Sequence, residues 1–173
     1  MFAVGDLIIY GTTGVCRVQE IAQRDLTGKG EQKLFYILQP VYQSCTISTP
    51  VDSGKVFMRP VITAQEARDL IAQIPHVEAL RLEGLSTREM TDLYEQVIST
   101  HDCSRLVALI RAIHEKREAV QMQKRKFGAL DERFFRRAED LLHGELAVAL
   151  GMKKDEIPAY IAQCIHEAEG GAQ

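Results

Sequence analysis

The hydrophobic pattern of this chain changes its period near residue 63, and that change constrains the fold more than any other feature. Before it, short apolar runs alternate with turns that contain glycine, such as Gly11-Thr12-Thr13-Gly14. Turns at intervals of about eight to twelve residues are typical of a small antiparallel barrel or sandwich. After it, apolar residues recur at helical spacing, and Thr63 with Glu66 forms a capping box that opens the first helix. The sequence therefore predicts an α+β chain with two domains, residues 1–62 and 63–173.

The two domains are expected to hold five strands and about five helices. The strands are predicted at residues 6–10, 15–23, 33–38, 45–49 and 57–59. The helices are predicted at residues 63–74, 86–99, 102 to about 121, 130–150 and 155–168. Ser86 and Glu89 form a second capping box, which fixes the start of the second helix.

The net charge of −3 conceals a basic segment. Residues 104–137 carry ten basic and only four acidic residues, whereas the flanking helices are acidic. A local field of this kind attracts phosphates even in a mildly anionic protein, so the total charge excludes only indiscriminate coating of nucleic acid. No window approaches the ~18 uninterrupted apolar residues of a membrane helix, and residues 1–10 lack the basic start of a signal peptide. We expect a cytoplasmic protein with no membrane contact.

No constellation of residues indicates catalysis. The chain lacks a nucleophile elbow, a phosphate-binding glycine loop and an H-E-x-x-H pair, and its four cysteines form no C-x-x-C motif. His101 and Cys103 form a close His/Cys pair, and a helix start with a small apolar residue explains them better than a metal site. We expect no enzyme activity, no cofactor and no metal.

The order of several short motifs resembles the CarD/CdnL-like family of bacterial transcription regulators over nearly the full length. The motifs are Phe2-Ala-Val-Gly-Asp6, Ile8-Ile-Tyr10, Gly14-Val15, Tyr36-Ile-Leu38, Thr46-Ile47, Pro50-Val-Asp52, Met58-Arg-Pro60, Leu141-Leu-His-Gly-Glu-Leu-Ala147 and Ala149-Leu-Gly151. The resemblance implies an amino-terminal Tudor-like or SH3-like barrel, shared with the transcription-repair coupling factor, that docks on the β subunit of RNA polymerase. It also implies a helical domain that contacts promoter DNA just upstream of the −10 region and stabilises the open complex.

The resemblance assigns polymerase contacts to one basic residue and one edge strand. The residues are Arg24, Thr46, Ile47, Ser48, Thr49 and Pro50. An exposed edge strand offers unpaired backbone groups to a partner strand, or to a second copy in a homodimer. Arg24 has the alternative interpretation of a solvated residue at a strand end. Ser48 stands where some members of the family carry Arg, which removes one charged contact.

The resemblance assigns DNA contacts to the start of the second helix, and the charge of the basic segment makes its residues candidates for phosphate contacts. The residues are Leu85, Ser86, Arg88, Lys124, Arg125, Lys126, Arg133 and Arg137. Relatives place at the Ser86 position a Trp that wedges into the minor groove, but this chain has no Trp at all. Ser86 is also explained as an N-cap, and the basic residues as a solvated helix face. The alternatives are thus a regulator that bridges polymerase and DNA, and an adaptor that binds protein only.

Overall fold

The computed structural model describes residues 1–171, and the chain forms two compact units, Met1–Ile62 and Thr63–Gln173. The first unit is built from strands, and the α-helices of the described residues all lie in the second. Each unit is described by itself below.

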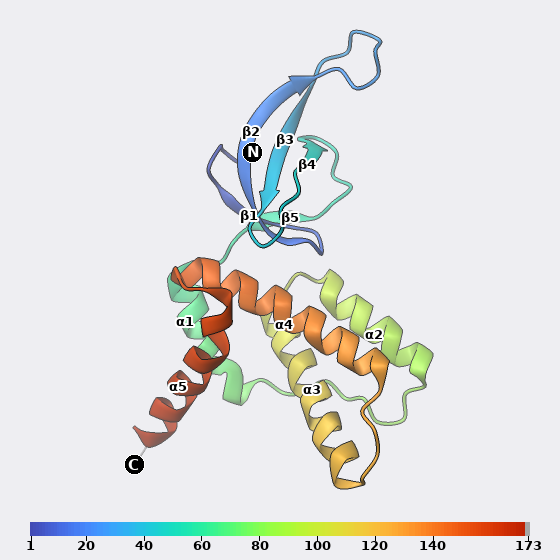
Figure 1. Cartoon of the computed structure of the whole chain (residues 1–173), viewed down its shortest axis with the longest axis vertical. Coiled ribbons are helices and arrows are strands. Elements are labelled where there is room, and N and C mark those ends of the chain that lie inside the picture. Colours follow the sequence, from blue (N-terminus) through green and yellow to red (C-terminus); the bar gives the residue numbers. More distant parts are fainter. Residues whose placement is uncertain (172–173) are drawn as a thin grey trace. The chain divides into compact units, whose positions relative to one another are not determined.

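The first unit is one antiparallel sheet of five strands (Figure 1). The strands are β1 (Leu7–Tyr10), β2 (Gly14–Arg24), β3 (Lys33–Pro40), β4 (Ile47–Pro50) and β5 (Met58–Pro60). Their order in the sheet is β4-β3-β2-β1-β5. The predicted number and order of strands along the chain are confirmed, but β4 begins two residues later than expected and β3 continues to Pro40.

The sheet is open, so the predicted Tudor-like barrel is not confirmed. β4 and β5 are its two edges, and the described residues contain no pairing between them. These edge strands are only four and three residues long, and a sheet closes into a barrel only where its two edge strands pair. A bulge between Val18 and Glu20 in β2 adds local bending to the sheet, because an extra residue on one strand increases its twist.

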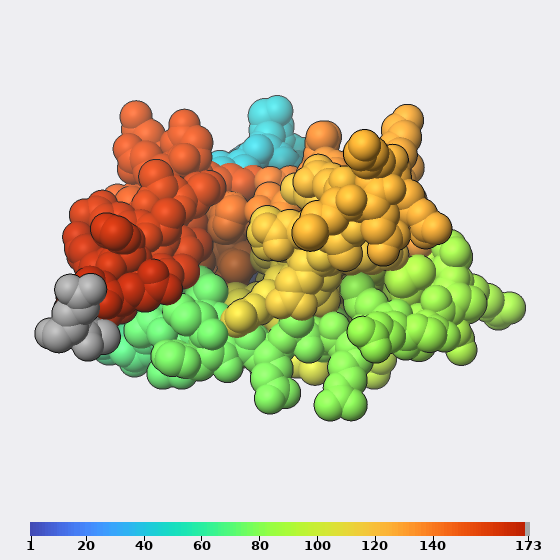
Figure 2. Space-filling view, turned by 90° about the horizontal axis from the view of Figure 1, so that it is seen from below, coloured from blue at the N-terminus to red at the C-terminus, as the bar shows by residue number. Residues whose placement is uncertain are grey.

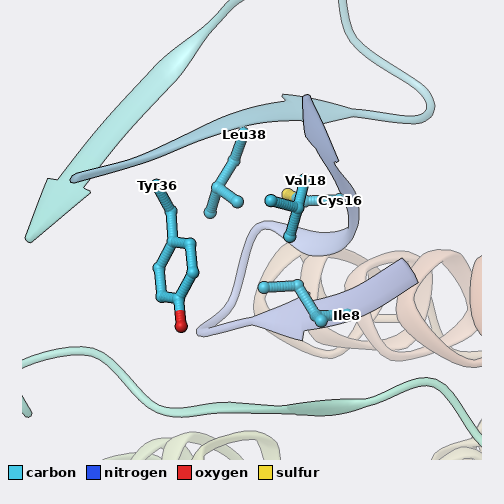
Figure 3. Packing of buried hydrophobic residues seen from close by; sticks show 5 residues of the cluster. All are labelled: Ile8, Cys16, Val18, Tyr36 and Leu38. Carbon is cyan, nitrogen blue, oxygen red and sulfur yellow. The ribbon is translucent and has the colours of Figure 1, made fainter. Parts of the chain in front are cut away.

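Five side chains from β1, β2 and β3 form the core of this unit (Figure 3). They are Ile8, Cys16, Val18, Tyr36 and Leu38, each at most 2% exposed. The backbone N–H of Phe2 donates to the Tyr36 hydroxyl at 2.9 Å, and the two rings lie 5.9 Å apart. Burial raises the pKa of the Cys16 thiol to about 11, so this cysteine behaves as a core residue and not as a nucleophile.

The second unit contains the five predicted α-helices and two short 3₁₀ turns that were not predicted. They are α1 (Ala64–Gln73), η1 (Ile74–His76), α2 (Thr87–Ser99), α3 (Cys103–Met122), α4 (Ala129–Leu150), η2 (Lys154–Glu156) and α5 (Ile157–Gly170). Both capping boxes form, at Thr63 with Glu66 and at Ser86 with Glu89. The last helix starts at Ile157 and not at Asp155, because residues 154–156 adopt the 3₁₀ turn first.

Helices α3 and α4 form an antiparallel hairpin that organises the second unit. α2 packs beside this hairpin on one side, whereas α1 and α5 lie together on the other (Figures 1 and 2). The interior contains Leu109 and Ile113 from α3 with Phe134 and Leu146 from α4, all at most 1% exposed. Gly151 ends α4 with a left-handed backbone at φ 65°, which a residue without a side chain adopts readily. None of the helices in residues 1–171 is long and apolar enough to cross a bilayer.

Candidate functional sites

The outer side of β4 is an open backbone edge. We call residues 46–50 the β4 edge. The N–H of Val51 donates to the carbonyl of Leu34 at 2.9 Å, which makes this a hydrogen-bonded pair of the β3–β4 ladder. Hydrogen-bonded pairs recur at every second residue, so Ile47 and Thr49 also bond to β3, and Ser48 turns its N–H and C=O outward. In residues 1–171 no strand covers that side.

Side chains divide the β4 edge between the core and the surface. Thr49 lies opposite Tyr36 in the register and is only 3% exposed, so it contributes to the core. Ile47 lies opposite Leu38 and is half-buried against the same core. Ser48 is exposed on the other face of the sheet, and Thr46 is exposed just before the strand. Of the five predicted residues, Thr46 and Ser48 are therefore the ones whose side chains lie fully exposed.

Arg24 lies at the far end of β2, directly opposite Lys33 of β3 in the register. Side chains alternate between faces along a strand, so Arg24 and Lys33 share the outer face of the sheet with Ser48 and Pro50. Both basic residues are exposed, and no carboxylate of the described residues lies within 4 Å of either. The structure thus brings Arg24 and the exposed part of the β4 edge onto one face.

Asp25 organises the hairpin tip that follows Arg24. Its carboxylate accepts hydrogen bonds from the N–H groups of Thr27, Gly28 and Gly30, at 3.0, 2.9 and 2.8 Å. These bonds, the one from Gly30 first among them, lower the pKa of Asp25 because they stabilise the charged form. The tip is therefore a defined turn, and it fixes the register of the two strands that carry Arg24 and Lys33.

In the helical unit, Ser86 serves as the N-cap of α2. Its hydroxyl accepts from the Glu89 N–H at 3.2 Å, and the Glu89 carboxylate accepts from the Ser86 N–H at 2.7 Å. The bonds from Ser86 lower the pKa of Glu89. Leu85 is half-buried, and Arg88 is exposed. The capping bonds alone therefore explain a serine at position 86. Leu85 is the apolar residue that directly precedes it.

A buried polar cluster fastens α2 to the α3–α4 hairpin. The Tyr94 hydroxyl donates to Asp131 at 2.8 Å, and the Lys116 ammonium lies 2.7 Å from the other oxygen of the same carboxylate. Lys116 also approaches the Met90 sulfur at 3.3 Å. Burial, helped by the bond to Asp131, raises the pKa of Tyr94, which keeps the hydroxyl protonated as a donor. Arg88 is two positions from Met90, so it faces away from this contact.

Arg117 holds the loop between α3 and α4. Its guanidinium lies over the rings of Phe127 and Phe135, at 4.7 and 4.4 Å, and donates to Glu132 at 3.0 Å. A cation between two aromatic faces in a half-buried position is stabilised by both rings. The loop at residues 123–128 is thereby fixed to α4 from one side, and Lys124 adopts a left-handed backbone at φ 54° where α3 ends.

The structure separates nine of the ten basic residues of the segment into tied and untied groups, and the tenth, Arg105, is exposed near the start of α3. Arg111 donates to three carbonyls of residues 74–77, and Lys116, Arg117 and Arg136 form ion pairs. The untied group that we call the basic hairpin end comprises Lys124, Arg125, Lys126, Arg133 and Arg137. Arg133 stacks at 5.1 Å on Phe134, and in residues 1–171 none of the five has a carboxylate within 4 Å. The predicted DNA residues thus form one basic group on the hairpin and a second, separate group at the start of α2.

Sequence reasoning missed two residues that the structure makes important. Lys33 was not distinguished from other strand residues, although its pairing with Arg24 follows once the hairpin register is known. Arg117 was counted only as a positive charge, although aromatic residues at 127 and 135 were available as a signal for stacking.

A groove of about 790 Å³ lies between residues 79–83 and α3. Its lining is Ala79, Leu80, Arg81, Leu82, Glu83, Ala112, Glu115, Lys116 and Ala119, with no Ser, Cys or His among them. Cys103 contacts buried Glu145 at 3.2 Å, away from that groove. In residues 1–171, no three His, Cys, Asp or Glu side chains are grouped as metal ligands.

Comparison with known families identifies the first unit. The family model of the CarD-like/TRCF RID domain matches residues 2–62. Residues 2–62 are thus similar to that domain family. The RID is the RNA polymerase-interacting domain that CarD-like proteins share with the transcription-repair coupling factor, so the resemblance to CarD is confirmed and RNA polymerase is supported as a partner. The matched range coincides with the strand unit, and the helical unit lies outside it.

Proposed function

We propose that this protein is a non-catalytic transcription regulator that binds the β subunit of RNA polymerase through its RID and promoter DNA through its helical unit. The observation that carries the proposal is the match of residues 2–62 to the RID family, in a sheet whose β4 edge is open. The bridging role connects that edge with the basic hairpin end.

The polymerase half of the proposal relies on strand addition. Ser48 presents an outward N–H and C=O, and a strand of the β subunit that pairs with them extends the sheet by one strand. Main-chain bonds of this kind supply affinity, and side chains on the outer face supply specificity. Arg24 supplies one charge on that face.

The DNA half of the proposal relies on phosphate contacts near the −10 region. The basic hairpin end offers five untied cations, and Arg117 limits the freedom that they would lose on binding. With Ser86 engaged as a cap and no Trp in the chain, we expect contacts to the backbone more than a wedge between bases. Such binding is weak alone, but tethering to polymerase raises the effective concentration of DNA at the hairpin.

A pull-down with the polymerase β subunit tests the first half. We expect the wild-type chain to be retained and Arg24→Glu to be retained less. Failure of the wild-type chain to bind polymerase would overturn the proposal. The lifetime of the open complex formed by purified polymerase, with and without the protein, then tests the regulatory role.

DNA binding is tested by titrating a promoter duplex at several salt concentrations. We expect the logarithm of the association constant to fall linearly with the logarithm of salt concentration, and the slope to become shallower in Lys124→Ala/Lys126→Ala. Arg136→Ala is a control that removes one charge, because Arg136 is tied to Glu132 at 2.8 Å and should leave the slope unchanged.

The capped Ser86 favours one second candidate, a protein-binding adaptor that has lost DNA contact. In that case the basic hairpin end is only a solvated surface. Affinity for duplex DNA would then be negligible at every salt concentration, while binding to polymerase would remain.

Catalysis has no part in the proposal. The groove beside α3 has no Ser, Cys or His in its lining, its Lys116 ammonium is paired with Asp131, and the buried acid Glu145 contacts a thiol. The proposed function therefore relies on binding alone.

A further inference from the structure

The register of the sheet places Lys33 between the two parts of the proposed polymerase surface. Arg24 is on β2 and the β4 edge is on β4, and β3 with Lys33 runs between them. Strands are spaced about 4.8 Å apart, so a partner strand beside β4 lies about 10 Å from β3 and about 14 Å from β2. Along the strand, Lys33 is two residues beyond the row that contains Phe35 and Pro50. A partner that touches both Ser48 and Arg24 must therefore pass Lys33.

Among residues 1–171, no carboxylate forms an ion pair with Lys33. Arg24 and Lys33 occupy directly opposite positions on one face, and like charges in that arrangement repel. Glu20 lies on the same face but pairs with Ile37, two rows away, and the Asp25 carboxylate accepts hydrogen bonds from the hairpin tip. Asp52 follows β4 in the turn closed by the Ser53 N–H and the Pro50 carbonyl at 3.4 Å. Neither carboxylate lies within 4 Å of Lys33.

We propose that Arg24 and Lys33 form a basic pair that binds one carboxylate of the polymerase segment docked on the β4 edge, and that Lys33 determines specificity together with Arg24. This inference rests on the proposed function and adds to it a residue and the acidic chemistry of the partner. A single carboxylate between the two side chains removes their mutual repulsion and accepts hydrogen bonds from both. The preformed hairpin tip, tied by Asp25, holds the two strands in the required register.

The test measures the dissociation constant of the full chain for RNA polymerase core enzyme. Lys33→Ala should weaken binding roughly three- to tenfold, and Lys33→Glu should weaken it more. Arg24→Ala combined with Lys33→Ala should weaken binding by less than the product of the single effects, because both residues hold the same carboxylate. The control is Lys29→Glu, which makes the same charge change in the hairpin tip and should alter the constant less than twofold.

Thermal unfolding of each variant verifies folding, and Lys33→Gln keeps the side-chain length if Lys33→Glu lowers stability. Lys33→Ala and Lys33→Gln that bind as tightly as wild type would overturn the inference, while a weakened Arg24→Glu would leave the proposed function intact. Single effects that multiply in the double variant would overturn the shared carboxylate. A wild-type chain without affinity for polymerase would overturn both proposals.

Discussion

In the proposed function the β4 edge and the basic hairpin end each contact a partner, but they present different groups. The β4 edge offers backbone N–H and C=O groups on a strand, with few charges beside it. The basic hairpin end offers side-chain cations on a loop and a helix, with no open backbone ladder. Backbone pairing depends on strand geometry and hardly on salt, whereas cation–phosphate contacts depend strongly on salt. In the proposed function, polymerase binding by the β4 edge and DNA binding by the basic hairpin end can therefore be weakened separately.

The largest expected effect comes from closing the β4 edge. Ser48→Pro removes the outward N–H without removing a bond to β3, because Ser48 turns away from that strand. We expect polymerase binding to weaken at least about tenfold, as a backbone donor is lost and the ring obstructs the partner strand. Ser48→Ala keeps the N–H and serves as the control. Equal binding by both variants would show that the edge is not the docking strand.

At the basic hairpin end, the largest effect is expected from replacing Arg117, which holds the loop between α3 and α4. Arg117→Met keeps the length of the side chain but loses the charge between the two rings and leaves Glu132 with Arg136 only. We expect the free energy of unfolding to fall by about 2 kcal/mol and trypsin to cut faster after residues 124–126. Denaturant unfolding and timed proteolysis measure these quantities. Arg136→Met, on a side chain that is 75% exposed, should change stability by less than about 0.5 kcal/mol.

The cap of α2 gives a smaller effect that concerns stability alone. Ser86→Ala loses the bond to the Glu89 N–H and should lower the free energy of unfolding by about 1 kcal/mol. Ser86→Asp retains an acceptor and should restore most of that loss. If Ser86→Ala instead reduced DNA affinity with no change in stability, Ser86 would be a contact residue.

The smallest effect is local and depends on pH. The pKa of Asp25 is lowered in the folded chain, so its bonds to the tip are complete above the ordinary pKa of 3.8 and are lost as the pH falls through the lowered value. Amide NMR shifts of Gly28 and Gly30 should therefore titrate below pH 3.8. In Asp25→Asn these amide shifts should not titrate at all. A midpoint above 3.8 in the wild type would contradict the hydrogen bonds between the Asp25 carboxylate and the hairpin tip.

The sequence predicts helix starts and the order of strands correctly where these depend on neighbouring residues. The capping residues Thr63 and Ser86 begin helices at the expected positions, and glycine turns separate the five strands in the expected order. The sequence does not predict features that depend on pairing between strands far apart in the chain. Closure of the barrel requires β4 and β5 to meet, and no local signal reports whether they do.

The candidate sites follow the same division. Arg24 and the β4 edge were located through family motifs, but the position of Lys33 beside Arg24 depends on the register of a hairpin. The sequence alone does not distinguish among the ten basic residues of the segment 104–137. Three of them hold the fold together, which only the tertiary contacts of Arg111, Lys116 and Arg117 reveal, and Arg136 pairs with Glu132 within its own helix.

Pro50 has a consequence for self-association. At the end of β4 it has no N–H to donate, and its carbonyl already accepts from Ser53 at 3.4 Å. An added strand therefore loses its ladder after Ser48, so the β4 edge offers one short stretch of pairing. Long, flat edges are the ones through which sheets of identical copies stack into aggregates. A strand that ends at a proline can receive a short partner strand while remaining a poor template for fibril growth.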